Sequence, residues 1–232
     1  MKVKILHYTP IKVMIQAART ATGIFVEGNE RDPANKRLIN RIINLEHDSV
    51  LEHVVYSIKI EGISRALLQQ WSRHRHVSQT VESTRYSLKR KLKELQYAEM
   101  NPQEQVEELF VIPDGAGFDD IYWREVYLGW LTILEDITDT EKNDVAKYFI
   151  PECLKTSLVA TVNARELDHI ITLRSQPNAL PEFQKLVKVL EGALLGLPCE
   201  WHRYIWTKLA ERRRCENVNK GQSEESLSSV WQ

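Results

Sequence analysis

The pattern of apolar positions along the chain predicts a fold in which helices outnumber strands. Alternation at residues 2–8, with β-branched and aromatic runs at 54–61 and 156–162, predicts three short strands. Apolar residues three or four apart predict helices over 10–19, 33–45, 64–71, 121–137, 141–149, 165–173, 182–194 and 200–213. We therefore expect an α+β fold, mostly helical with a small sheet.

Breaks in this pattern suggest where the elements and the domain end. Gly62 is expected to end the second strand. Residues 99–120 combine prolines, glycines and many acids, which predicts a loop or a junction. The last stretch is polar and without repeats, so we expect one large domain over residues 1–214 and a polar C-terminal tail over 215–232.

Composition narrows the class of protein without naming a function. The chain has 232 residues, 43% of them hydrophobic, which is enough for a substantial core. Its 31 basic and 32 acidic residues give a net charge of −1, which disfavours a broad nucleic-acid-binding face. A single nucleotide stays compatible, because it needs only a local cluster of arginines. No apolar run reaches the roughly 18 residues of a membrane span.

Cysteine usage and the N-terminal sequence bear on location. Cys153, Cys199 and Cys215 are sparse, odd in number and without CxxC spacing, which is typical of a reducing compartment. The first residues lack the apolar core of a signal peptide. The sequence therefore predicts a cytoplasmic protein.

The most informative segment covers residues 70–86. On a continuous helix, Arg73, His74 and Arg75 would point about 100° apart, so they can surround one anion only if the helix ends here. Arginine offers a planar, permanently charged fork for phosphate or an anionic ring. Ser83 and Arg85 would project to one side of an extended segment. A solvated basic helix end is the alternative.

These residues also resemble a known family. Arg73-His74-Arg75, seven residues, then Ser83-Thr84-Arg85-Tyr86 is similar to the signature motif of flavin-dependent thymidylate synthases. Further segments resemble other elements of that family in the same order, over residues 3 to 195. These segments are 47–53 (HDSVLEH), 63–71 (ISRALLQQW), 163–167 (NAREL), Leu173-Arg174 and Pro151.

The resemblance implies an activity and an assembly. Family members reductively methylate deoxyuridylate to thymidylate, using methylenetetrahydrofolate as one-carbon donor, FAD as cofactor and NADPH as reductant. No cysteine acts as nucleophile. Similar proteins are homotetramers whose active sites form between subunits, so this chain would be one subunit of a homotetramer.

The resemblance also implies which residues bind FAD. They are Arg73, His74 and Arg75, with Ser49, Asn163, Ala164, Arg165 and His169. Cationic and amide donors suit this ligand, because a reduced flavin can carry negative charge and FAD adds a pyrophosphate.

The nucleotide would be held by two segments and two separate cations. They are Gln70, Trp71, Ser72 and Arg73; Val81, Glu82, Ser83, Thr84 and Arg85; Lys147; and Arg174. Arg174 and Ser83 are carried over as catalytic residues, with Arg174 favouring ionisation at uracil N3. A guanidinium cannot act as a base near neutral pH, but its charge can stabilise a uracil anion.

Departures from the family pattern leave two alternatives open. Lys147 replaces the usual arginine, and His169 a frequent asparagine. Residues 80–82 (TVE) and 175–182 (SQPNALPE) also differ. One alternative is a flavin enzyme that modifies C5 of another pyrimidine nucleotide. The other is a catalytically silent flavin- or nucleotide-binding homologue, against which intact Ser83, Arg85 and Arg174 argue.

Other candidates favour structural interpretations. Cys199 follows a proline, as in the unrelated cysteine-dependent thymidylate synthases, but the rest of that pattern is missing. No metal site is expected, because His74 and His76 lie between arginines that oppose a cation. The basic runs 89–93 and 212–214 are interpreted as solvated helix faces. Trp123, Trp130, Trp201 and Trp206 are expected in the core or at an interface.

Overall fold

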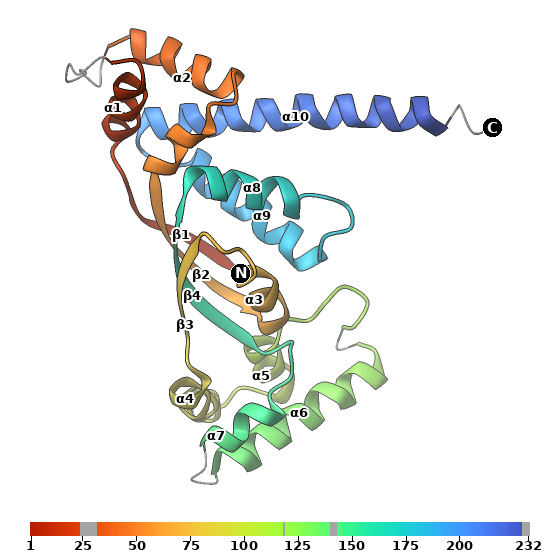
Figure 1. Cartoon of the computed structure of the whole chain (residues 1–232). Helices are drawn as coiled ribbons and strands as arrows, with labels where there is room; N and C mark the ends of the chain where they lie inside the picture. Colours follow the sequence, from red (N-terminus) through yellow and green to blue (C-terminus); the bar gives the residue numbers. More distant parts are fainter. Residues whose placement is uncertain (24–31, 118, 140–142, 229–232) are drawn as a thin grey trace. The chain divides into compact units, whose positions relative to one another are not determined.

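The computed structural model describes residues 1–23, 32–117, 119–139 and 143–228. Residue contacts divide the chain into two compact units. Unit 1 comprises Met1–Lys2, Lys59–Arg75 and Gln79–Ala160, and unit 2 comprises Val3–Ile58, His76–Ser78 and Thr161–Gln232. Figure 1 colours the chain from red at residue 1 to blue at 232, so the segments that belong to each unit can be located by their colour. No helix in the described ranges is long and apolar enough to span a membrane.

Four strands form one sheet in the order β1-β2-β4-β3. Their bounds are Lys2–Tyr8 (β1), Val55–Ser64 (β2), Val77–Val81 (β3) and Lys155–Asn163 (β4). A bond from Thr9 N to Val55 O joins the end of β1 to the start of β2, and Arg65 N to Leu154 O joins the end of β2 to the start of β4, so both pairs are antiparallel. The three predicted strands are confirmed, and β3 is an addition.

Gly62 lies inside β2, so the expectation that it ends the strand is wrong. Its φ of +71° is a conformation that glycine adopts readily, and the strand continues to Ser64. A Cβ at this position would lie 3.3 Å from the backbone nitrogen of Met1. Glycine here allows a close backbone approach within the sheet.

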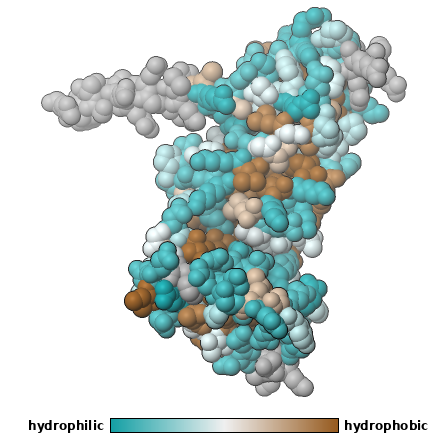
Figure 2. Space-filling view, turned by 180° about the vertical axis from the view of Figure 1, so that it is seen from behind, coloured by the Kyte–Doolittle hydropathy of each residue, from teal (hydrophilic) through white to brown (hydrophobic). Residues whose placement is uncertain are grey.

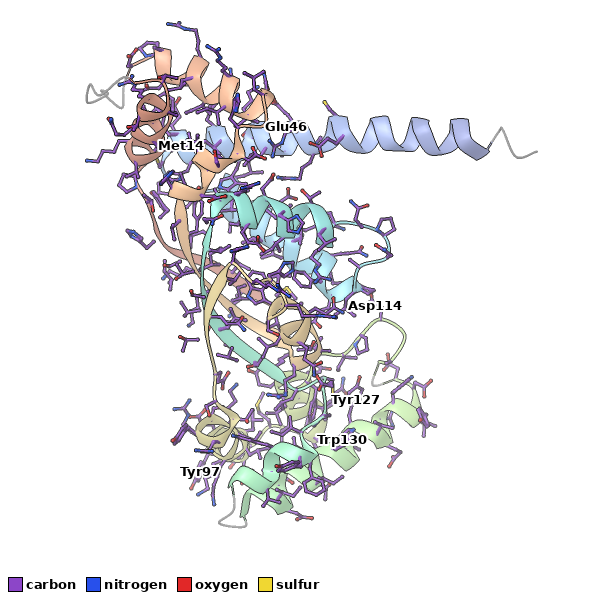
Figure 3. All side chains as sticks on the ribbon, viewed as in Figure 1. Met14, Glu46, Tyr97, Asp114, Tyr127 and Trp130 are labelled. Atoms are coloured by element: carbon purple, nitrogen blue, oxygen red, sulfur yellow. The ribbon has the colours of Figure 1, made fainter. Side chains whose placement is uncertain are left out.

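Unit 1 adds helices to its part of the sheet. They are α3 (Arg65–Trp71), α4 (Thr84–Tyr97), α5 (Pro102–Leu109), α6 (Ile121–Asp139), α7 (Asn143–Ala146) and the short 3-10 helix η2 (Lys147–Phe149). Leucines of α4 and α5 pack with Phe110, Tyr127 and Leu131 in one apolar cluster. Tyr127 and Trp130 are labelled on α6 in Figure 3. The expected helix over 141–149 is present from residue 143, and its first two residues lie outside the described ranges.

Helix α5 lies within the stretch 99–120, which was expected to be a loop. Asn101 caps this helix by accepting from Glu104 N at 3.0 Å, and the Glu104 carboxylate accepts from Asn101 N at 2.9 Å. Pro102 occupies the first helical turn, where its missing N–H carries no penalty. The proline and the acidic residue are therefore helix-start signals here.

Unit 2 contains helices from both ends of the chain. They are α1 (Ile11–Ala21), α2 (Ala34–Asn44), the 3-10 helix η1 (Asp48–His53), α8 (Ala164–Arg174), α9 (Pro181–Leu195) and α10 (Glu200–Ser228). In Figure 1, α8 and α9 lie side by side, and they also share residue contacts. Met14, Leu51, Trp206 and Leu209 are among its fully or almost fully buried residues. Helix α10 is longer than the expected 200–213 and passes through the proposed domain boundary at 214.

Large apolar side chains are exposed on unit 1. Tyr86, Tyr97, Ile121 and Tyr148 are each more than half exposed. Figure 2 shows brown apolar areas between teal polar ones on the face that it presents. The homotetramer stays a prediction.

Candidate active site

A cavity of about 590 Å³ lies within unit 2. Its walls come from the segment around η1, from α8 with its cap residue, and from the middle of α10, with His76 added from the turn just before β3. The lining residues are Glu46, Asp48, Glu52, His76, Asn163, Arg165, Glu166, Asp168, His169, Thr172, Arg212, Arg213 and Glu216. Glu46 is labelled in Figure 3. A cavity of this size is typical of cofactor and substrate sites.

Strand β4 passes directly into α8 and presents three predicted FAD-binding residues to this cavity. Asn163 caps the helix through its side-chain oxygen, which accepts from Glu166 N at 2.8 Å. The cap leaves the amide NH2 of Asn163 as a donor toward a ligand. Arg165 and His169 are four residues apart, so they lie on one face of α8. Both side chains are exposed.

Arg165 already has an anionic partner. Its Nη1 lies 2.5 Å from Oε1 of Glu52, which is on η1, and the two side chains are 55% and 47% exposed. An exposed pair of this kind adds little stability, typically about 0.2–1 kcal/mol. A bound anion can therefore take the place of Glu52 at small cost.

An ion-pair network supports the wall of the cavity. Arg212 of α10 bridges Asp48 and Asp168, and Arg213 contacts Asp168 and Glu191. Burial raises the pKa of Asp168, and the charges of Arg213 and Arg212 act in the opposite direction. The interpretation of residues 212–214 as a solvated face is wrong for Arg212 and Arg213, which are mostly buried. Arg214 is exposed.

The segment 70–86 belongs mainly to unit 1 and changes direction twice. Helix α3 ends at Trp71, which confirms that Arg73, His74 and Arg75 do not continue a helix. His74 is buried, with its ring centroid 6.4 Å from that of Trp71, whereas Arg73 and Arg75 are exposed. The buried ring holds the turn and leaves both guanidinium groups facing outward.

The second half of the signature forms the start of α4. Ser83 is the N-cap residue and Arg85 lies in the first turn, so the expectation that both project from one extended segment is wrong. The Ser83 hydroxyl makes no capping bond. A helix start with a hydroxyl and a guanidinium is suited to a phosphate, because its backbone N–H groups also point toward the ligand.

A second cavity of about 430 Å³ lies within unit 1. Glu82 and Thr84, from the predicted nucleotide site, are among its lining residues. Glu82 is held there by Lys91, whose Nζ lies 2.7 Å from Oε1. Lys91 of the basic run is therefore paired and half-buried.

The two predicted cations outside the signature lie on different units. Lys147 begins η2 in unit 1 and is exposed. Arg174 ends α8 in unit 2, with its guanidinium carbon 4.8 Å from the ring centroid of buried Phe183. Such stacking restricts the plane of the guanidinium.

The predicted FAD and nucleotide residues are thus divided between the units. Asn163, Arg165 and His169 share the unit 2 cavity, whereas Ser49 and Arg174 are in the same unit but not among its lining residues. Unit 1 contains Gln70 to Arg75, Val81 to Arg85, and Lys147. Trp71 and Ala164 are fully buried, so their side chains are not accessible to a ligand. The lining residue His76 was missed, and its position directly after the Arg-His-Arg motif is the signal that could have found it.

Titration and metal-binding potential limit the chemistry. Burial raises the pKa of the Cys153 thiol to about 11. In the described part of the chain, no group of three or more His, Cys, Asp or Glu residues could hold a metal ion.

Comparison with known proteins identifies the family. Residues 4–193 match the family model described as thymidylate synthase complementing protein. The flavin-dependent thymidylate synthase of Helicobacter pylori is 39% identical over 210 residues, which cover 89% of this chain and 97% of that protein. The enzyme of the same name from Campylobacter jejuni is 37% identical over 207 residues, covering 89% and 96%.

Solved structures agree with this assignment. A crystal structure of thymidylate synthase X from Helicobacter pylori with FAD and dUMP matches with a TM-score of 0.71 and 37% identity. The match covers 90% of this chain and 99% of that one. The chain therefore belongs to the flavin-dependent thymidylate synthase family.

Proposed function

We propose that this enzyme methylates deoxyuridylate to thymidylate, with methylenetetrahydrofolate as carbon donor, FAD as cofactor and NADPH as reductant. The main support is the similarity to the Helicobacter pylori enzyme with FAD and dUMP, which extends over 90% of this chain. The chain also carries the signature residues Ser83 and Arg85, and Arg174 of the separate Leu173-Arg174 element.

The donor chemistry of the unit 2 cavity fits part of FAD. Asn163, Arg165 and His169 can donate to flavin or ribityl oxygens, and Ser49 and the backbone of Ala164 lie on the adjoining elements. Carboxylates outnumber arginines in this cavity, so it does not suit a pyrophosphate by itself. Exposed Arg73 and Arg75, with His74 between them, would supply the missing positive charge from a neighbouring subunit.

Two features of unit 1 support nucleotide binding. Ser83 and Arg85 at the start of α4 would take the phosphate. Lys147 adds a second positive charge, without the fork of an arginine. Gln70, Ser72 and the segment Val81 to Thr84 would surround the nucleotide. A homotetramer with active sites between subunits would bring these groups to the unit 2 residues of a neighbour.

Arg174 is proposed to activate the uracil ring. Its guanidinium stays protonated, so it stabilises negative charge at N3 and raises the electron density at C5. Phe183 keeps the guanidinium oriented while the base enters. When bound and reduced by NADPH, the flavin would supply the hydride that completes the methyl group.

No cysteine is needed as a nucleophile in this scheme. Cys153 is half-buried, and its raised pKa keeps the thiol protonated at neutral pH. Cys199 and Cys215 lie outside the signature segments. The ring is instead activated by charge, through Arg174.

Two substitutions test whether Arg174 acts on the uracil ring and Arg75 on FAD. Arg174→Ala should retain FAD with a normal visible spectrum and lose tritium release from 5-tritiated deoxyuridylate. Arg75→Ala should weaken FAD retention first, and excess FAD should partly restore turnover. Losing a charge-assisted partner at a buried anionic site typically costs about 2–5 kcal/mol, which either assay can detect.

A matched control and a contrary result complete this test. Arg214→Ala removes an exposed arginine outside the proposed site and should change neither property. A silent flavin-binding homologue would be yellow and release no tritium even as the wild type. If Arg174→Ala lost flavin while Arg75→Ala lost only nucleotide binding, the two assignments would be reversed.

A further inference from the structure

A single guanidinium on α10 joins the two elements of unit 2 that carry the proposed FAD residues. Arg212 Nη1 and Nη2 donate to Asp48 Oδ1 and Oδ2, at 2.8 and 3.2 Å. The same Nη2 donates to Asp168 Oδ2 at 3.0 Å. Asp48 begins η1 and Asp168 lies in the middle of α8, so Arg212 links these elements directly.

Both carboxylates are next to residues assigned to FAD. Asp48 precedes Ser49, and Asp168 precedes His169 and follows Arg165 by less than one helical turn. Because α8 is a hydrogen-bonded helix, fixing Asp168 fixes the direction in which Arg165 and His169 project. A second, exposed ion pair, between Glu52 of η1 and Arg165 of α8, also joins these two elements.

Arg213 holds the same carboxylate from a second direction. Its Nη1 donates to Asp168 Oδ1, and its Nη2 donates to Glu191 Oε1 of α9 at 2.5 Å. Asp168 therefore receives a guanidinium on each of its two oxygens. Both oxygens are engaged by donors, which leaves its side chain little freedom to rotate.

We propose that Arg212 is a positioning residue for FAD binding, acting through Asp48 and Asp168 on the donors of η1 and α8. The proposal rests on the proposed function, since it concerns the same cofactor site. Arg212 lies beyond residues 4–193, the part matched by the family model, and outside the motif segments that carry the resemblance.

Burial and geometry distinguish this bridge from an ordinary surface ion pair. The Arg212 side chain is 16% exposed, and those of Asp48 and Asp168 are 23% and 8% exposed. A lysine at residue 212 would keep the charge, but its single ammonium could not reproduce the fork that engages both oxygens of Asp48. Arg212→Lys therefore tests whether the geometry of the guanidinium matters in addition to its charge.

The experiment compares FAD affinity with stability in Arg212→Lys and Asp48→Asn. Arg212→Lys should keep a melting temperature near that of the wild type and raise the FAD Kd by about tenfold or more, which is the size of effect known for partners that orient metal ligands. At saturating FAD, its tritium release should return toward the wild-type rate, because the reacting groups are intact. Asp48→Asn removes one leg of the bridge and should weaken FAD binding in the same direction.

Lys208→Ala is the matched control. Lys208 lies one turn earlier on α10, and its Nζ makes an ion pair with Glu211 of the same helix at 2.7 Å. This variant should leave the FAD Kd unchanged. The proposal is overturned if Arg212→Lys and Asp48→Asn both bind FAD as tightly as the wild type, or if Lys208→Ala weakens binding equally.

Hydrogen exchange tests the bridge without relying on FAD. In ligand-free protein, Arg212→Lys should speed amide exchange in residues 48–54 and 163–169, while Lys208→Ala should not. A wild type that binds no FAD would count against the proposed function alone, and the exchange result would still decide whether the bridge orders these segments. Unchanged exchange in both segments would overturn the positioning role.

Discussion

Stability should fall in mild acid because of one buried histidine. His202 on α10 is fully buried, and its Nδ1 lies 2.7 Å from the Tyr56 hydroxyl. That hydroxyl accepts from Trp206 Nε1 at 3.0 Å and still has its own proton to donate. In a neutral imidazole Nδ1 can accept this proton, and protonation of Nδ1 removes that acceptor. Burial lowers the pKa of His202 from 6.5 to about 4, and the backbone of Thr9 acts in the opposite direction.

The size and sign of the effect follow from the two pKa values. A shift of about 2.5 units at about 1.36 kcal/mol per unit gives a full effect of about 3.4 kcal/mol. The unfolded chain binds the proton first, so the contribution is complete above pH 6.5 and is lost as the pH falls toward 4. By pH 5 the free energy of unfolding should have dropped by about 2 kcal/mol from this residue.

Urea unfolding at pH 7.5 and pH 5.0 measures this loss in the wild type and in His202→Asn. Asparagine can still accept from Tyr56 but does not titrate, so the variant should start less stable and lose about 2 kcal/mol less on acidification. Other groups, including Asp168 with its raised pKa, are common to both proteins and cancel in the comparison. His7→Asn, at an exposed position, should behave as the wild type. Equal pH dependence in the wild type and His202→Asn would refute the reasoning.

Three further substitutions test other parts of the account. Replacing Cys153, Cys199 and Cys215 together by Ala or Ser, in a folded variant, should leave turnover near wild type, whereas loss of activity in Cys199→Ala with FAD still bound would contradict the cysteine-free scheme. Lys147→Arg should leave activity intact or lower the KM for deoxyuridylate by restoring the fork, and a large rise in that KM would contradict the idea that an arginine fork fits this position. Gly62→Ala should lower the free energy of unfolding by about 1–3 kcal/mol, because alanine is strained at positive φ and its Cβ would approach Met1. A melting curve identical to that of the wild type would show that β2 tolerates a side chain there.

Local patterns predicted the elements whose burial is regular. β2 alternates buried Tyr56, Ile58 and Ile60 with less buried neighbours, so its period of two is visible in the sequence. The amphipathic spacing of α6 and α9 was likewise sufficient to place both helices within two residues at each end. Elements are recognised from sequence when one face is consistently apolar.

The predictions that were wrong share a physical reason, because each depends on contacts that form only in the folded chain. Pro102 and Glu104 indicate a loop by composition, but together with Asn101 they form the start of α5. Arg212 and Arg213 occur in a basic run that would ordinarily be solvated, and only the fold brings Asp48 and Asp168 to them. The motif residues of the proposed site were visible in the sequence, whereas nothing in it distinguished Arg212 and Arg213 from an ordinary basic run.

The central claim is tested most directly by measuring thymidylate formed by the purified wild-type protein. The complete mixture contains FAD, NADPH, deoxyuridylate and methylenetetrahydrofolate, and parallel reactions omit FAD, reductant or folate in turn. We expect thymidylate to accumulate over many turnovers in the complete mixture, to stop when reductant or folate is omitted, and to fall to the level supported by retained flavin without added FAD. Protein that carries FAD and binds deoxyuridylate but forms no thymidylate in the complete mixture would contradict the proposed function.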